Sequence, residues 1–457
     1  MNRRVVISGI GAVSGLGLSS AALWDALCAG RSALRPITRF DASGFPSRLG
    51  AQVANGPDGA AFSARDFVPK HYRKAVKVMA RDIEIAVAAA KDAVEDAKLT
   101  TRATLPEESA DPTTHRSDRM GCHIGAGLIA ADADELAAAL VTARRSPTSE
   151  DVDLQRWGGT AGNGNAGMMD NLTPLWLLKY LPNMLSCHVT ILHGCEGPSN
   201  TITCAEASGL LSIGESMRVI RRGDADLCFS GGAESKLNYM GLLRMDFAKR
   251  LAPTSDETDG SNVVRPFDPA SPGGLLGEGG GILILETLDA ASARGARIHA
   301  EVLSVGAAHS GPPGAPGTPA DHDAGCLYAI ENSLEQARVK PEEIDAIVPL
   351  ALGNVDTDAG EAGALRRVFG SNLKSIPLVT LAPALGGCVS GTGALQAAVA
   401  AMCVSRQMLP ARIHAGQPPA DLLAGPAPAC SARLRHVLVC SGSQHGQHAA
   451  MVLRSVP

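Results

Sequence analysis

Two side chains that could do chemistry stand two residues apart in the segment Thr203-Cys204-Ala205-Glu206-Ala207-Ser208-Gly209, which leads into a predicted helix. A thiolate at the start of a helix is stabilised by unpaired backbone N–H groups and the helix dipole, and it can accept an acyl group from a thioester. A carboxylate is stabilised there too, but it cannot hold a useful acyl thioester. The function of the turn therefore depends on whether Cys204 or Glu206 occupies the reactive position.

The motifs along the chain resemble, in type and order, those of the β-ketoacyl synthases, which extend fatty acids and polyketides on acyl carrier protein. The resemblance runs nearly end to end. Its densest parts are Ser208-Gly209-Leu210-Leu211-Ser212-Ile213-Gly214-Glu215, Gly223-Asp224-Ala225-Asp226, Ser230-Gly231-Gly232-Ala233-Glu234, Arg265-Pro266-Phe267-Asp268 and Gly277-Glu278-Gly279-Gly280-Gly281. A series of motifs in this order is far more specific than one glycine-rich loop.

This resemblance places Glu206 at the family's nucleophile position. In active members a Thr-Ala-Cys-x-x-Gly turn is followed by a helix that ends in Gly-Asp-Ala-Asp. Counting back from Gly223 without gaps reaches position 206, and Cys204 then falls where the family usually has threonine. An active β-ketoacyl synthase that uses Cys204 is the less favoured alternative, because two extra residues would have to enter the first helical turn.

Three further positions of the family's site also differ. Active members use two histidines to stabilise charge on the thioester carbonyl oxygen. Near the first, this chain has Leu352 in the segment 349–354, whose register can shift by a few residues, and no histidine lies between His322 and His414. Cys388 stands at the second histidine, and Gln444 stands at the phenylalanine of a Gly-Phe-Gly-Gly gate. The resemblance therefore implies that no catalytic residue is intact.

Within the family, this combination resembles the chain-length factor, an inactive subunit that pairs with a catalytic ketosynthase. The resemblance implies a heterodimer in which this chain shapes the partner's acyl tunnel. The substrates would be carried on the phosphopantetheine of acyl carrier protein, and no cofactor is expected. Such factors often have glutamine at the position of Glu206. Two more alternatives stay open: a starter subunit resembling a malonyl-carrier-protein decarboxylase that uses Glu206, and a homodimeric acyl-binding scaffold.

The fold that the resemblance implies is a thiolase-like α/β fold in a five-layer αβαβα arrangement. Two similar halves, residues 1–290 and 291–457, would each hold a five-stranded sheet, with helices between the sheets. Short β-branched runs such as residues 5–7, 282–285 and 437–439 favour buried strands. Hydrophobic residues make up 45% of the chain and aromatic residues only 3%, which favours closely packed α/β layers.

Several surface features bear on partners. The resemblance implies that a strand and loop at about residues 183–203 form much of a dimer interface. Arg218, Arg221 and Arg222 form a candidate basic patch for acidic carrier protein, or else a solvated helix face. Residues 100–119 and 145–168 lack an apolar period and are predicted to be surface loops.

Composition excludes some functions. The net charge of -5 argues against nucleic acid or an anionic membrane surface as partner. The most apolar stretch, residues 172–192, is interrupted by polar residues and proline, so no membrane span is predicted. Eleven cysteines without repeating spacings, and no leader before the first predicted strand, indicate a cytoplasmic protein.

Other pairs of reactive residue types are assigned to structure. His445 and His448 have a spacing that could bind a metal, but their motif lacks further ligands, so we predict a polar loop and no metal site. Cys187-His188 and His193-Gly194-Cys195 invite a Cys-His catalytic interpretation, yet packing is the stronger prediction. Glu234 and Glu278, in glycine-rich motifs, are expected to accept hydrogen bonds from turn amides.

Overall fold

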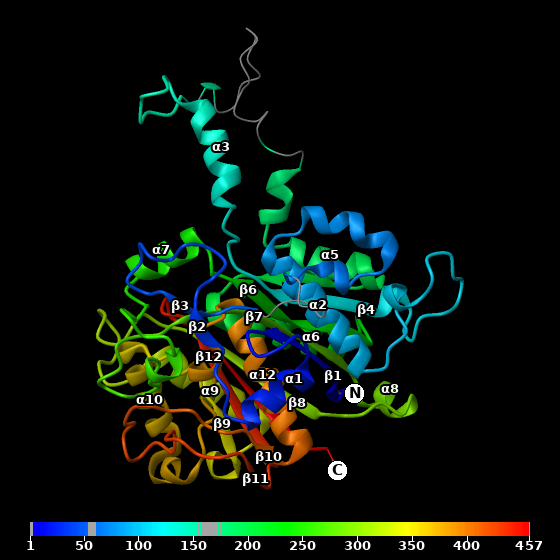
Figure 1. The fold of residues 1–457 in the computed structure, drawn as a ribbon. Helices are drawn as coiled ribbons and strands as arrows, with labels where there is room; N and C mark the ends of the chain where they lie inside the picture. The colour runs from blue at the N-terminus through cyan, green and yellow to red at the C-terminus, as the bar shows by residue number, and fades with distance from the viewer. Residues whose placement is uncertain (1–2, 54–60, 154, 157–171, 173–174, 457) are drawn as a thin grey trace.

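The computed structural model describes residues 3–53, 61–153, 155–156, 172 and 175–456. Its main strands follow one hydrogen-bonded path in the order β5-β4-β6-β7-β1-β8-β13-β12-β9, and Figure 1 shows them packed among helices. The strands of this path are β1 (Val5–Ser14), β4 (Met120–Gly125), β5 (Ser199–Ile202), β6 (Leu227–Ser235), β7 (Leu276–Thr287), β8 (Ala300–His309), β9 (Ala346–Val348), β12 (His436–Gly442) and β13 (Gln447–Arg454). The predicted thiolase-like α/β fold is confirmed.

The two parts of this path meet at a short seam between β1 and β8. Only two residue pairs, Val6 with Glu301 and Ile7 with Ala300, join the strands there. The first part has the five expected strands, β5, β4, β6, β7 and β1. The second part has four strands on the path, and Leu378 forms a parallel bridge to Ile347 of β9 beside them. The division of the chain at residue 290 stays a prediction.

Two helices form the layer between the two parts of the sheet. Helix α6 (Ser208–Arg222) packs against β4, β6 and β8, while α12 (Ser390–Arg406) packs against β6, β7 and β12. The helices also contact each other, and a Cβ atom added to Gly209 would lie 2.6 Å from the backbone nitrogen of Ala394. Only glycine allows this approach, which brings the starts of both helices together.

The outer helices cover the other faces of the sheet. Helices α2 (Arg81–Asp96) and α5 (Met184–His193) cover the first part, α9 (Ala324–Ala337) covers the second, and α10 (Val355–Phe369) packs against α9 (Figure 1). The prediction of a strand at residues 183–203 was therefore wrong for residues 184–193, which form α5. Leu185, Val189 and Leu192 have helical spacing and are buried. The strand in this region is β5 alone.

The predicted surface loops are borne out in part. Residues 100–119 are irregular apart from the 3-10 turns η3 (Arg102–Thr104) and η4 (Ser117–Arg119), and Nε2 of His115 anchors them 2.8 Å from Oε1 of Glu286. Of residues 145–168, position 154 and positions 157–168 lie outside the described residues. Helix α3 (Ala133–Ala143), just before them, projects from the body (Figure 1).

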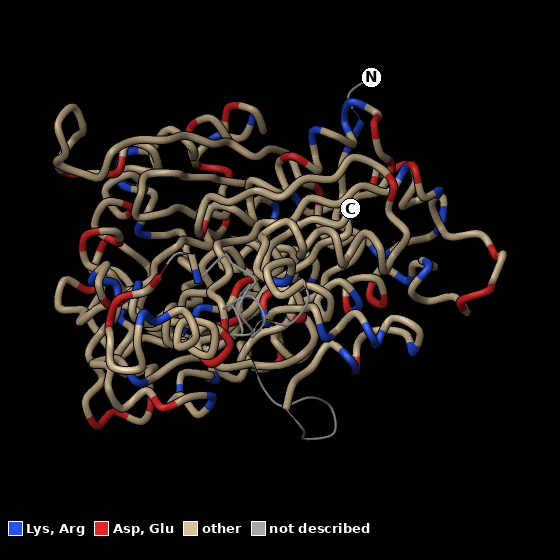
Figure 2. Tube along the Cα trace, turned by 90° about the horizontal axis from the view of Figure 1, so that it is seen from above, with Lys and Arg blue, Asp and Glu red and all other residues tan. Residues whose placement is uncertain are grey.

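The remaining elements are short and lie around this core. They are α1 (Ser20–Cys28), β2 (Leu34–Pro36), β3 (Leu49–Ala51), η1 (Ala64–Asp66), η2 (Lys70–Val78), η6 (Trp176–Tyr180), η7 (Ala205–Ala207), α7 (Tyr239–Phe247), η8 (Gly260–Asn262), α8 (Leu288–Ala293), η9 (Pro341–Glu343), η10 (Gly370–Ser375), α11 (Ala382–Leu385), β10 (Met408–Leu409) and β11 (Cys430–Ser431). Acidic and basic residues are interspersed along the described parts of the trace (Figure 2). Within the described ranges, no helix has both the length and the apolar character needed to cross a bilayer.

Candidate functional site

Glu206 lies in the 3-10 turn η7, immediately before α6, and its side chain is only 1% exposed. The preceding residue, Ala205, has φ +47°, in the left-handed region that favours glycine. Holding alanine there costs about 1 kcal/mol or more, which the surrounding packing must offset. Part of that support comes from Ser441 of β12, whose Oγ donates to the Glu206 carbonyl oxygen at 2.7 Å. Both parts of the fold therefore fix the backbone of residue 206.

The carboxylate of Glu206 is paired with a guanidinium. Its Oε1 accepts from Nη2 of Arg250, a residue just after α7 whose side chain is 15% exposed. The carbonyl oxygen of Arg250 accepts from Nδ2 of Asn354 at 2.9 Å, so the loop after β9 helps to hold it. Oε2 of Glu206 is buried and has no hydrogen-bond partner among the described residues. A buried carboxylate needs such a countercharge, because an unpaired one is strongly destabilising.

The space around this ion pair is small. Glu206, Arg250, Leu352, Asn354 and Val389 are among the residues that line a cavity of about 20 Å³. That volume has room for about one water molecule, whereas pockets for organic ligands are usually about 300–1,000 Å³. The cavity therefore has no space for an acyl chain.

Leu352 is held in this cavity by two buried carboxyl groups of α10. Glu361 accepts from the backbone N–H of Leu350 at 2.8 Å and of Ala351 at 2.9 Å, and Asp358 accepts from that of Gly353 at 3.0 Å. Burial raises the pKa of Glu361 to about 8 and that of Asp358 to about 7. These hydrogen bonds therefore fix the loop so that the apolar side chain of Leu352 faces the cavity beside Glu206.

Cys388 approaches from the turn between α11 and α12. Its Sγ is buried and lies 3.9 Å from the carbonyl oxygen of Leu385, and burial raises the pKa of the thiol to about 12. Together with Leu352 it lines a second cavity of about 10 Å³. Because Leu352 lines both cavities, Glu206, Leu352 and Cys388 converge from three separate loops. None of the three side chains offers an N–H donor to a thioester carbonyl.

Cys204 and Gln444 do not line the Glu206 cavity. Burial raises the pKa of the half-buried Cys204 thiol, and the backbone N–H of Cys204 donates to Oγ of Ser208 at 2.7 Å. This thiol is therefore not activated as a nucleophile. Gln444 is exposed and lines a separate surface cavity with Asp321 and Asp356. The structure does not place it beside Glu206.

Arg250 is the site residue that sequence reasoning missed. A buried glutamate predicts a cationic partner in general terms, because ionised side chains are rarely buried unless they are paired. Nothing in the local pattern around Lys249-Arg250 indicates which cation that partner is, since Glu206 and Arg250 are 44 positions apart. Only the folded chain identifies the pair.

The cysteine and histidine pairs set aside above have structural contacts. Nδ1 of His188 lies 3.0 Å from the hydroxyl of Tyr72, and Nδ1 of His193 lies 2.9 Å from that of Thr101. Burial raises the pKa of the Cys195 thiol well above its usual range. These contacts favour packing over catalysis.

Among the described residues, the two C-terminal histidines do not belong to a cluster of metal ligands. His445 is exposed, while Nε2 of His448 lies 3.1 Å from Oδ2 of Asp323. Across the described part of the chain, no group of three or more histidine, cysteine or acidic side chains could hold a metal ion.

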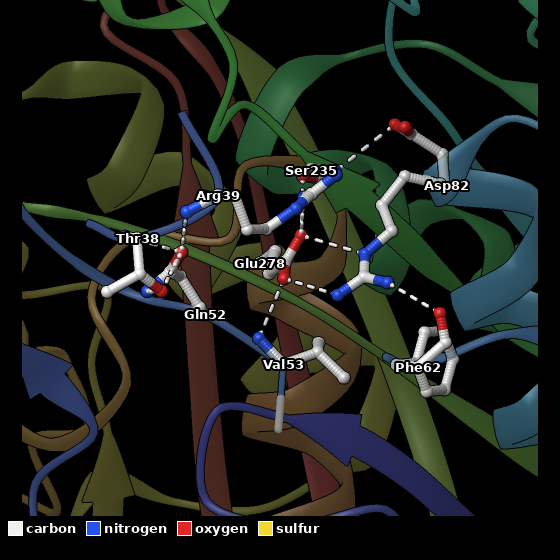
Figure 3. Close-up of polar contacts among 9 residues, drawn as sticks. Thr38, Arg39, Gln52, Val53, Phe62, Asp82, Ser235 and Glu278 are labelled. Atoms are coloured by element: carbon white, nitrogen blue, oxygen red, sulfur yellow. Dashed lines mark hydrogen bonds and ion pairs between the residues drawn. The ribbon is translucent and has the colours of Figure 1, made fainter. Parts of the chain in front are cut away.

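Glu278 is the centre of a buried ion cluster (Figure 3). It accepts from the backbone N–H of Val53 at 2.7 Å and from Oγ of Ser235 at 2.8 Å, and it pairs with Arg39 and Arg81, each at 2.8 Å. Burial alone would raise the pKa of Glu278, but the two guanidinium groups lower it below its usual value. The predicted bond to a backbone amide is present, while the ion pairs were not foreseen.

Glu234 makes a similar link from β6 to α12. Its Oε2 accepts from the backbone N–H of Ser390 at 3.0 Å, and its Oε1 pairs with Lys236. Nζ of Lys236 also donates to the carbonyl oxygen of Leu128 at 2.6 Å. The predicted hydrogen bond from a backbone amide is again present, and the contacts of Lys236 fix the loop after β4.

The arginines of the candidate basic patch on α6 make polar contacts within the chain. Arg221 donates to the carbonyl oxygen of Leu303 at 2.9 Å, Arg218 lies 3.5 Å from Glu215, and Arg222 lies 3.0 Å from Asp224. These contacts favour the interpretation of a solvated helix face.

Comparison with known proteins agrees with this fold: the chain belongs to the β-ketoacyl synthase family. Residues 2–291 match the Beta-ketoacyl synthase, N-terminal domain, and residues 299–416 match the Beta-ketoacyl synthase, C-terminal domain. The family resemblance seen in the motifs is confirmed.

Relatives of this chain include a 3-oxoacyl-[acyl-carrier-protein] synthase and a putative polyketide synthase. It is 27% identical over 421 residues to the 3-oxoacyl-[acyl-carrier-protein] synthase 2 of Staphylococcus aureus (strain COL), covering 91% of this chain and 89% of the relative. It is 28% identical over 468 residues to the Putative polyketide beta-ketoacyl synthase 1 of Streptomyces halstedii, covering 99% and 98%. Among solved structures, the ishigamide ketosynthase/chain length factor is similar with a TM-score of 0.79 and 27% identity, over 100% of both chains.

Proposed function

We propose that this protein is a non-catalytic subunit of the chain-length-factor type, which forms a heterodimer with an active ketosynthase and shapes that partner's acyl tunnel. The observation that carries the proposal is the Glu206–Arg250 ion pair at the nucleophile position, closed into a cavity of about 20 Å³. The substrates would be carried by the phosphopantetheine of acyl carrier protein and would react in the partner's site.

The chemistry of condensation supports this assignment. The reaction needs a nucleophile that forms an acyl thioester, and donors aimed at the carbonyl oxygen, where negative charge develops. Glu206 lacks sulfur and its charge is already engaged by Arg250. Leu352 has no polar hydrogen, and the buried thiol of Cys388 is a weak donor. None of the required functions is supplied by these three side chains.

An edge of the sheet supports a partner subunit. Within the described residues β5 pairs with β4 and with no other strand, and its four residues are exposed or half-buried. Strand edges of this kind are templates for pairing with another chain. Ile191 of the adjacent α5 is 63% exposed, which adds apolar surface. We therefore assign residues 183–203 to the interface, with a helix and an edge strand where a strand was expected.

The same surface suggests which side chain shapes the tunnel. Leu128 follows the end of β4, whose last residue, Gly125, is paired with Ile202 of β5. Its side chain is 63% exposed, while Lys236 holds its carbonyl oxygen at 2.6 Å. A large apolar side chain on a fixed loop near a strand edge is suited to contact a partner. We assign Leu128 to the wall of the partner's tunnel.

Three alternatives receive less support. Decarboxylation by Glu206 would require space for a malonyl thioester beside a carboxylate that Arg250 already engages. An active synthase based on Cys204 would require a thiolate, whereas burial raises the pKa of that thiol. A homodimeric scaffold differs from the proposal only in its partner, so the oligomeric state distinguishes it.

Co-expression with a candidate ketosynthase partner tests the proposal. We expect a stable 1:1 complex in size-exclusion chromatography with light scattering, and condensation of malonyl and acyl carrier protein by that complex. The isolated chain should show no condensation and no release of carbon dioxide from malonyl carrier protein. Turnover by the isolated chain that a Cys204→Ala variant loses would contradict the proposal, and a homodimer that ignores the ketosynthase would favour the scaffold.

A further inference from the structure

A larger cavity lies at the seam between the two parts of the fold, away from Glu206. Its volume is about 640 Å³, which is within the usual range of about 300–1,000 Å³ for small-molecule sites. The segments before β1, β8 and β12 and the ends of α12 and β13 contribute to it. The residues that line it are Arg4, Ile298, His299, Val404, Ser405, Gln407, Arg433, Leu434, Arg435, Arg454, Ser455 and Val456. We refer to it as the seam groove.

The seam groove carries an excess of positive charge. Arg4 and Arg454 both pair with the buried carboxylate of Glu301, each at 2.6 Å. Arg433 and Arg435 also line the groove, and their guanidinium groups have no hydrogen-bond or ion-pair partner in the described part of the chain. Four arginines therefore line the groove and no acidic residue of the described chain does, while Glu301, Asp289, Glu343 and Asp345 contribute negative charge from outside the lining.

Asp345 brings a negative charge close to Arg435 but forms no ion pair with its guanidinium. Asp345 accepts from the backbone N–H groups of Arg435, at 2.6 Å, and of His436, at 2.9 Å, so it caps the chain there. His299 lines the groove with Nε2 2.7 Å from Oδ2 of Asp96, while its buried Nδ1 has no hydrogen-bond partner among the described residues. The fold thus leaves both positive charge and one polar atom of the lining unsatisfied.

From this arrangement we infer that the seam groove binds a small molecule that carries a diphosphate group. Guanidinium groups bind phosphate oxygens in a bidentate fashion, and several of them together suit more charge than one phosphate monoester, about −1.5 to −2, supplies. Ile298, Val404, Leu434 and Val456 add apolar surface for an organic part of the ligand. A nucleoside diphosphate has this chemistry and a fitting size.

This site is independent of the proposed function. Residues at the end of α12 line the seam groove, whereas Val389, just before the start of α12, lines the Glu206 cavity. At 1.5 Å per residue the 17-residue helix separates the two by about 25 Å. Binding in the groove neither requires nor tests a ketosynthase partner.

Isothermal titration of the full chain with ADP, pyrophosphate and inorganic phosphate at near-physiological salt tests the inference. We expect ADP and pyrophosphate to bind about tenfold more tightly than inorganic phosphate. The double variant Arg433→Ala/Arg435→Ala should weaken their binding by about tenfold or more. The matched control is Arg65→Ala/Arg73→Ala, which removes the same charge from two other exposed arginines.

Each other outcome overturns the inference. Absence of binding by both diphosphates would show that the groove is not a diphosphate site. Equal affinity for inorganic phosphate would reduce it to a simple anion site, and an equal loss of affinity in the control variant would indicate unspecific attraction to the whole chain. Unchanged thermal unfolding of both double variants without ligand verifies that they are folded.

Discussion

Glu206 and Arg250 form a buried ion pair in which the carboxylate comes from the turn before α6 and the guanidinium from the loop after α7. Each side chain is the countercharge of the other, and both line the same small cavity. Removing one partner leaves a buried charge, which typically costs about 3–5 kcal/mol, whereas replacing both with apolar groups is often nearly neutral.

The first prediction concerns the stability of this pair. Arg250→Met should lower the free energy of unfolding by about 3–5 kcal/mol, and Glu206→Leu/Arg250→Met should recover much of that loss. Urea denaturation measures both values. Arg73→Met, at an exposed position, is the control and should stay within about 0.5 kcal/mol of wild type. If Arg250→Met also stays within that limit, the pair does not stabilise the chain.

The second prediction concerns thiol reactivity. Iodoacetamide reacts with thiolates, and burial raises the pKa of Cys204 while Cys430 is exposed. We expect Cys430 to be alkylated first and Cys204 about tenfold or more slowly at pH 8, because burial disfavours the Cys204 thiolate and limits access of the reagent. Peptide mapping by mass spectrometry gives both rates. Rapid, selective alkylation of Cys204 would instead favour an active synthase.

The third prediction concerns pH. Asp358 and Glu361 have folded pKa values of about 7 and about 8, raised by burial from ordinary values near 4. The folded state therefore keeps protons that the unfolded chain has released, so stability is complete at low pH and is lost as the pH rises through the folded pKa. We expect the free energy of unfolding to fall by about 2 kcal/mol from pH 6.5 to 8.

The chosen window lies above most of the opposing titration. Burial lowers the pKa of His123 to about 4, so this histidine opposes the carboxyl groups mainly below pH 6.5, with a smaller effect that extends into the window. Glu286, with a pKa of about 2, acts at lower pH. Asp82, with a pKa of about 7, acts in the same direction as Asp358. Urea titrations of wild type and Glu361→Gln measure the slope, which the variant should make shallower. An identical slope would exclude Glu361 as a source.

The fourth prediction concerns the length of the product. If Leu128 contributes to the partner's tunnel, Leu128→Ala in the heterodimer should give longer acyl products and Leu128→Phe shorter ones, because side-chain volume limits the space available. Mass spectrometry of the released products gives the distribution. Leu423→Ala, a partly exposed leucine of the C-terminal half, is the control. Unchanged products from both Leu128 variants in an intact complex would remove Leu128 from this role.

Sequence reasoning predicted the fold and several side chains of the site, but not their pairing. The glycine motifs were informative because positions such as Gly209 are fixed by close backbone contacts. The segment 184–193 was misread because its burial was assigned to a strand, although Leu185, Val189 and Leu192 have helical spacing. Arg250 could not be predicted, since its partner is set by tertiary structure. Gln444 was placed at a gate by motif order; it is exposed and lines a separate surface cavity, and its role at the gate stays a prediction.

The approach of Gly209 to Ala394 sets how α6 and α12 meet, and no reactive group takes part in it. The architecture of the centre is thus decoupled from its chemistry. Side chains at positions 206, 352 and 388 can therefore change while the packing of α6 and α12 is kept. The surface that contacts another protein can then be retained without any reaction at these positions.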